Sequence, residues 1–132
     1  MIMMLRKYMS LLGIGSAQID LVLPKQTYRP GEQIEAYFLI QGGTIEQRIN
    51  RIDCDLMLEN HADETSKTIE SRTILSSRTI AAEELNKVPF TFRLPEVLPV
   101  PGRDESYRFK TKLTFDQGAE SVVDQDWIKI VV

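Results

Sequence analysis

The chain has one cysteine and one histidine among its 132 residues. Cys54 therefore cannot form a disulfide within the chain. Its apolar surroundings predict a small buried core residue, and this use of cysteine fits a reducing cytoplasm. His61 lies in the polar stretch "ENHADE" without a serine or cysteine signature nearby. Because a catalytic triad needs a nucleophile held beside the imidazole, we predict no catalytic residues and no enzymatic activity.

The sequence also lacks the signatures of nucleotide-binding and nucleic-acid-binding sites. Gly13 and Gly15 have neither the third glycine nor the strand–helix context of a dinucleotide site, and no phosphate-binding P-loop is present. The net charge is −3 and no block of like charge dominates, so nucleic-acid binding is not predicted. No cofactor is expected.

The sequence also has no apolar run long enough to span a membrane. In residues 1–15, Leu5, Met9 and Leu12 recur at helical spacing, which predicts a short N-terminal helix or extension. A serine and two glycines interrupt this stretch, so it makes a poor secretory signal; a targeting peptide or membrane-touching helix is the alternative. We expect a single domain over residues 1–132, cytoplasmic and without membrane contact.

After this stretch, apolar and polar residues alternate with the period of half-buried strands. Strands with one apolar face must cover those faces against each other. The sequence therefore predicts an all-β fold, a two-sheet antiparallel β-sandwich of the immunoglobulin-like type. The stretches with this period are 17–23, 33–41, 52–58, 88–94, 107–115 and 126–132. The predicted core is dominated by Phe38, Phe90, Phe92, Phe109, Leu113 and Phe115.

Glycines and parity changes give expectations for two connections. Gly42 and Gly43 predict a tight hairpin with positive φ angles after the 33–41 strand. The apolar residues before and after Asn50 and Arg51 have opposite parity, which predicts a β-bulge there.

One strand is expected to lie at the edge of a sheet. Residues 67–80 are rich in threonine and isoleucine and are interpreted as a single polar edge strand. An exposed edge can accept a partner's strand by main-chain pairing, so this segment is our candidate for protein contact. Pro89 similarly confines its own strand to an edge or a strand start.

Acidic residues occur in two Asp-x-Asp pairs, Asp53 with Asp55 and Asp124 with Asp126. Both pairs are expected to project outward from their strands. Hard cations require several oxygen ligands that converge from loops, whereas acidic pairs on strands are usually solvated. We therefore predict no metal site.

Four residues form the candidate partner surface. Arg108, Lys110 and Lys112 make a basic stripe on one strand face, opposite the aromatic residues that single-stranded nucleic-acid binding would require beside them. This stripe is either a solvated face or a docking surface for an acidic protein. Trp127 has outward parity in the last strand, where it would contact a partner or cap the sandwich.

The stretch "QTYRPGEQ" at residues 26–33 predicts a tight reversal of the chain. Pro30 presets φ at the first central turn position, Gly31 accepts the positive φ of the second, and Tyr28 is expected to fold back toward the sheet. A strand, "YRPGE", an alternating strand and a later "VPFTFRLP" together resemble the arrestin-like sandwich.

The resemblance narrows further. "LLGIGSAQIDLVLPKQTYRPGEQIEAYFLIQGGTIEQRINRIDCDLML" and the closing "VDQDWIKIVV" resemble the N-terminal domain of the bacterial sporulation-control protein M family. This resemblance implies a cytoplasmic, non-enzymatic regulator or scaffold of sporulation or a related developmental process, acting through protein contacts. Members usually carry a second, similar sandwich; if it is absent here, a homodimer could replace its contacts.

A different function class stays open beside this one. A ligand-binding β-sandwich for a sugar or a membrane lipid would use Trp127, Tyr107 or the N-terminal helix.

Overall fold

The structure is a computed structural model that describes residues 15–116 and 121–132. The helix predicted for residues 1–15 thus falls outside the described residues, except for Gly15. Within the described part of the chain, no helix is long and apolar enough to cross a membrane. The strands are β1 (Gln18–Val22), β2 (Thr27–Tyr28), β3 (Gln33–Gln41), β4 (Gln47–Asn60), β5 (Thr65–Leu75), β6 (Thr79–Ile80), β7 (Leu85–Arg93), β8 (Glu105–Phe115) and β9 (Val122–Ile130).

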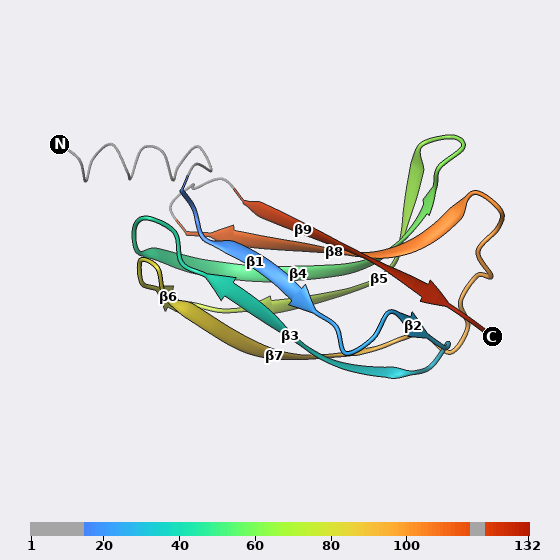
Figure 1. Cartoon of the computed structure of the whole chain (residues 1–132), viewed down its shortest axis with the longest axis horizontal. Coiled ribbons are helices and arrows are strands. Elements are labelled where there is room, and N and C mark those ends of the chain that lie inside the picture. The colour runs from blue at the N-terminus through green and yellow to red at the C-terminus, as the bar shows by residue number, and fades with distance from the viewer. Residues whose placement is uncertain (1–14, 117–120) are drawn as a thin grey trace.

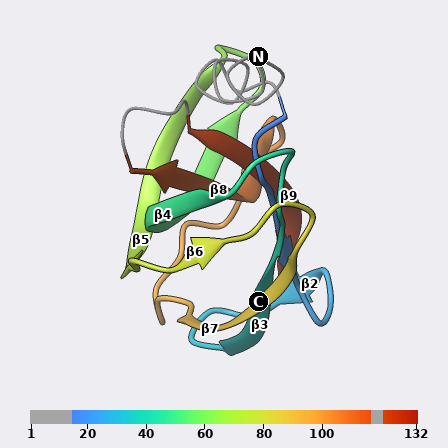
Figure 2. The same ribbon diagram turned by 90° about the vertical axis from the view of Figure 1, so that its left-hand side faces the viewer.

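The strands form two sheets that face each other, as Figures 1 and 2 show. One sheet has the order β1-β3-β7 and the other has the order β2-β9-β8-β4-β5, with β6 paired to the start of β4. The all-β, two-sheet prediction is confirmed. One pairing departs from it, because the short strand β2 runs parallel to the end of β9.

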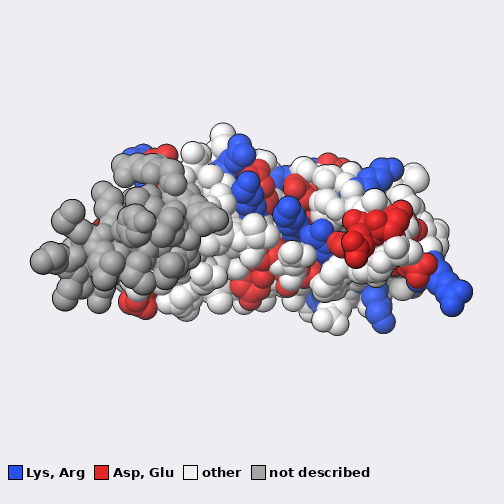
Figure 3. All heavy atoms as spheres, turned by 90° about the horizontal axis from the view of Figure 1, so that it is seen from above, with Lys and Arg blue, Asp and Glu red and all other residues white. Residues whose placement is uncertain are grey.

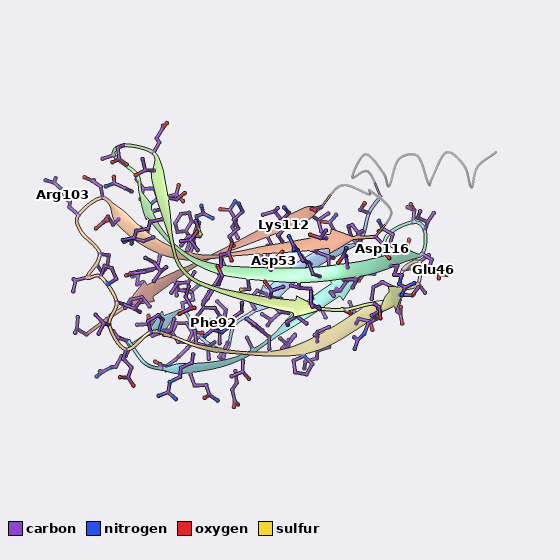
Figure 4. The ribbon with its side chains drawn as sticks, turned by 180° about the vertical axis from the view of Figure 1, so that it is seen from behind. Glu46, Asp53, Phe92, Arg103, Lys112 and Asp116 are labelled. Carbon is purple, nitrogen blue, oxygen red and sulfur yellow. The ribbon has the colours of Figure 1, made fainter. Side chains whose placement is uncertain are left out.

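The core lies between the sheets and contains the six residues predicted to dominate it. Phe38 and Leu113 are fully buried, and the other four are 1–7% exposed. Phe92 packs edge-on against Phe109 of the opposite sheet at 5.1 Å between ring centroids, and Figure 4 shows Phe92 between the two layers. Alternation alone located this core because every strand has one face toward the other sheet.

The hairpin predicted at Gly42 and Gly43 is wrong. Strand β3 belongs to the three-stranded sheet and β4 to the six-stranded sheet, so these glycines carry the chain across from one layer to the other. Neither has a positive φ. A Cβ on Gly42 would collide with the carbonyl oxygen of Ala81, and one on Gly43 with that of Gly15. Close backbone approach, and not turn geometry, explains both glycines.

The bulge prediction is confirmed, since the register between β4 and β8 shifts between Ile49 and Arg51. The single strand predicted over residues 67–80 is divided in two. Strand β5 ends at Leu75, and the chain leaves it before the short β6. The break follows a hydrogen bond from the Ser76 N–H to the Asn50 carbonyl, after which β6 pairs with the first residues of β4.

The reversal at residues 29–32 agrees with the sequence. Gly31 has φ of +80°, and the Glu32 N–H donates to the Arg29 carbonyl at 3.1 Å. Tyr28 is 1% exposed, and its hydroxyl donates to the Lys25 carbonyl at 2.6 Å. This turn positions β2 beside β9 and carries no reactive group.

Candidate functional site

The predicted basic stripe lies on the outer face of the six-stranded sheet. Arg108, Lys110 and Lys112 share this face, as their parity indicates, but their surroundings differ. Arg108 is only 8% exposed, and its Nε donates to Glu59 Oε2 at 2.6 Å. Lys110 is half-buried and Lys112 exposed. The stripe is therefore not uniformly accessible.

Acidic residues of the neighbouring strand interrupt the stripe. In the register of β4 with β8, Asp53 lies opposite Lys112 and Asp55 opposite Lys110. Figure 4 shows Asp53 and Lys112 on the same face, and Figure 3 shows basic and acidic side chains interspersed over the molecule seen from above. Cross-strand pairs of opposite charge favour the observed register. The acidic pair Asp53 and Asp55 projects outward, as predicted.

Trp127 and the buried arginine form a second feature of this face. The Arg108 guanidinium lies 5.8 Å from the centroid of the Trp127 ring, and the His61 ring lies 5.5 Å from it at a tilt of 43°. Trp127 is 47% exposed. The β4–β5 turn places His61 beside Trp127. The main-chain N–H of His61 donates a hydrogen bond to the Asp104 carbonyl at 2.8 Å. Parity predicted the outward tryptophan, but local sequence could not indicate its partner across the fold.

A groove of about 300 Å³ lies beside this tryptophan. Its walls come from the segment before β2, the β4–β5 turn, and the strands β8 and β9. The lining residues are Gln26, His61, Ser106, Trp127, Ile128 and Lys129. Tyr107, which the ligand-binding alternative included, is 1% exposed and donates its hydroxyl to the Pro99 carbonyl, so it does not reach this groove.

The second acidic pair is placed differently from its prediction. Asp124 and Asp126 lie opposite Thr111 and Phe109 of β8, both of which face the core. The pair therefore points inward and not outward. Together with Asp20 of β1 it forms an acidic cluster, whose carboxylate oxygens lie within 4.8 Å of one another.

The acidic cluster joins the two sheets along one side. The Leu21 N–H of β1 donates to Asp124 Oδ2 of β9 at 3.1 Å. Burial, and then the nearby Asp124, raise the pKa of Asp126 to about 7; the same two causes raise the pKa of Asp20. One oxygen of Asp126 is buried without a hydrogen-bond partner. A raised pKa of this kind is what neighbouring carboxylates produce when no cation lies between them. An acidic cluster by itself does not define a metal site, so we do not assign one here.

Parity could have located this cluster. Counting back from Ile128, which was predicted to face the core, places Asp126 and Asp124 on the inward face as well. Their polar character led to the outward assignment, because buried carboxylates are rare. The contribution of Asp20, more than one hundred positions earlier, has no local signal.

Cys54 also faces the core, as predicted. It is 1% exposed, and burial raises the pKa of its thiol to about 12. A thiol in this state is not nucleophilic at neutral pH.

The long strand β5 lies at the end of the six-stranded sheet. It pairs with β4 over residues 65–75 and has no further neighbour in that sheet among the described residues. The other candidate edge, β7, contains Pro89 opposite Tyr37 of β3, which fits the expected restriction of proline to an edge. Strand β5 contains no proline.

The fold and these surfaces define a class: a two-sheet β-sandwich with a long exposed edge and a polar outer face. Within that class the sequence assigns the family. The chain belongs to the family described as SpoOM protein, whose model matches residues 5–132.

Individual relatives agree with this assignment. The sporulation-control protein spo0M of Bacillus subtilis (strain 168) is 37% identical over 94 residues, which cover 67% of this chain and 36% of that protein. The crystal structure of Spo0M from Bacillus subtilis superposes with a TM-score of 0.79 at 33% identity, covering 90% of this chain and 51% of the other. The chain thus spans about half or less of the length of these relatives.

A more distant likeness concerns the fold alone. The CARDB domain of the PF1109 protein from Pyrococcus furiosus, solved in complex with di-metal ions, has a TM-score of 0.53 at 11% identity, with 88% of each chain covered.

Proposed function

We propose that this domain is a non-enzymatic regulatory or scaffold module in the control of sporulation or a related bacterial developmental process. The family and its Bacillus subtilis relative support the process. We further propose that the protein acts in the cytoplasm through contacts with other proteins, and that a homodimer is one form of such contact.

The observation that favours protein contact is the exposed edge of β5. This strand is 11 residues long and lacks proline, so its outer N–H and C=O groups can pair with an added strand. Its outward side chains alternate with half-buried ones, and Leu75 at its end is 78% exposed. Edges of this length are usually protected in proteins that do not pair through them.

The remaining candidate surface is less suited to an acidic partner. Glu59 neutralises Arg108, and the two lysines face aspartates across the sheet. Lys112 and Trp127 are exposed enough to add to a protein contact whose main site is the β5 edge.

Proline scanning of residues 69–74 tests the proposal. Each variant is first checked for cooperative thermal unfolding, because proline also disrupts pairing with β4 at positions whose N–H faces that strand. Folded variants should lose co-purification of partners from crosslinked native cells. Val97→Pro, in an exposed loop, is the matched control and should retain them. Retention of every partner by all folded β5 variants would refute edge pairing.

A further inference from the structure

The groove beside Trp127 combines an exposed aromatic residue with several polar residues. Its volume of about 300 Å³ lies at the lower end of the range for small-ligand pockets. The half-exposed Trp127 and the largely buried Ile128 line it together with four polar residues, Gln26, His61, Ser106 and Lys129. No carboxylate lines the groove among the described residues.

The tryptophan at this groove is held in place before any ligand arrives. Arg108 lies against its ring and is itself fixed by Glu59, while His61 contacts the ring from the β4–β5 turn. These contacts favour the observed orientation of the indole, in which about half of its surface is exposed. A fixed aromatic surface loses little conformational entropy when it binds a ligand.

The polar groups indicate which ligand chemistry fits. The Gln26 amide, the Ser106 hydroxyl and the His61 imidazole can donate and accept hydrogen bonds, which suits a ligand with several hydroxyl groups. The electron-rich indole face attracts the C–H groups of a sugar ring. Lys129 adds a positive charge that a carboxylate would complement.

We propose that the groove lined by Gln26, Trp127 and Lys129 binds an acidic saccharide, with a pyranose ring on the indole and its carboxylate toward Lys129. The groove and the proposed edge pairing share no residue. The groove is centred on β9, which β8 and β4 separate from β5, and its one wall near β5 is His61 in the preceding turn.

The chain offers a direct reporter, because Trp127 is its only tryptophan. The protein is titrated with trigalacturonate, with the methyl ester of the same trisaccharide, and with a tetraglutamate peptide while its fluorescence is followed. Trigalacturonate should give a saturable change. The neutral ester should bind about two- to fivefold more weakly, the ratio that one exposed ion pair supplies. The peptide should give no saturable change.

Variants locate the binding. Gln26→Ala and Lys129→Met change exposed side chains and keep the reporter, and each should weaken trigalacturonate binding. Trp127→Ala, followed by calorimetry, should weaken it about tenfold or more. Lys112→Met removes a charge elsewhere on the same outer face and should bind like the parent.

Three results would overturn the proposal. They are the absence of a saturable response to both trisaccharides, an equal response to tetraglutamate, and unchanged affinity in Gln26→Ala, Lys129→Met and Trp127→Ala together. Any of these would leave the edge-pairing proposal untouched, because the partner assay on β5 uses neither the groove nor the saccharide.

Discussion

The two long sides of the sandwich differ in how their charges are compensated. Where β5 meets the three-stranded sheet, Arg72 pairs with Glu70 at 2.7 Å and lies 5.2 Å from the centroid of the Phe92 ring. Where β1 meets β9, Asp20, Asp124 and Asp126 converge, and a proton near neutral pH takes the place of a cation. The side with the acidic cluster should therefore lose stability as the pH rises toward neutral.

The difference also concerns hydrogen bonding between the layers. On the β1 side a main-chain N–H of one sheet reaches a carboxylate of the other. On the β5 side a side-chain contact links the layers, and the outer edge of β5 has no paired strand among the described residues. A main-chain hydrogen bond thus joins the layers on the first side, whereas a side-chain contact joins them on the second.

The largest effect is expected from the core beneath the β5 side. Phe92→Ala removes a 1%-exposed ring that contacts Phe90 and Phe109, and it should lower the free energy of unfolding by about 3–5 kcal/mol. Urea denaturation at constant pH measures this loss. A loss below about 1 kcal/mol would show that the ring does not support this side.

The next effect concerns the acidic cluster. The pKa of Asp126 is raised from its ordinary value of 3.8 to about 7 in the folded protein, so the folded state binds a proton that the unfolded state has released. This contribution to stability is present at low pH and is lost as the pH rises from about 4 to about 7.

Asp126→Asn keeps the uncharged shape of the carboxyl group and should remove this loss. The difference in free energy of unfolding between the variant and the parent should grow in favour of the variant by about 1–2 kcal/mol from pH 5 to pH 8. This value is smaller than the full pKa shift would give, because solvent screens the partly exposed carboxyl group. Urea denaturation over this pH range measures the difference. Asp55→Asn, on the outer face, is the control and should follow the parent; a parallel pH profile for Asp126→Asn would contradict the account.

A smaller effect on stability is expected on the β5 side, where Arg72 pairs with Glu70. Arg72→Met removes one half-exposed ion pair and one cation–π contact, which together should contribute about 0.5–1 kcal/mol. Urea denaturation at constant pH measures this loss. A loss as large as that of Phe92→Ala would show that this contact does more than compensate charge.

The sequence predicts the layers of this fold better than its connections. Alternation identifies the residues that face the core, including Phe38 and Leu113, because one covered face is a property of each strand alone. Which strands share a sheet depends on contacts between distant segments, and that is why Gly42 and Gly43 were wrongly expected to form a hairpin. Their collision partners, Ala81 and Gly15, lie far away in the sequence.

The candidate surfaces show the same limit. The outward position of Trp127 follows from parity, whereas its contacts with Arg108 and His61 require the β4–β5 turn to lie over β9. The inward position of Asp126 also follows from parity, but polarity was given more weight. Charge pairing across β4 and β8 could not be inferred until their register was known.

Site-specific photocrosslinking in native cells tests most directly whether partners bind at the β5 side. Ser71 and Gln125 occupy one cross-strand row of the outer face, connected through Asp55 and Lys110, and both are exposed. A photoreactive residue at position 71 should capture a protein partner, and the same residue at position 125 should capture none. Capture at position 125 without capture at position 71 would contradict the account.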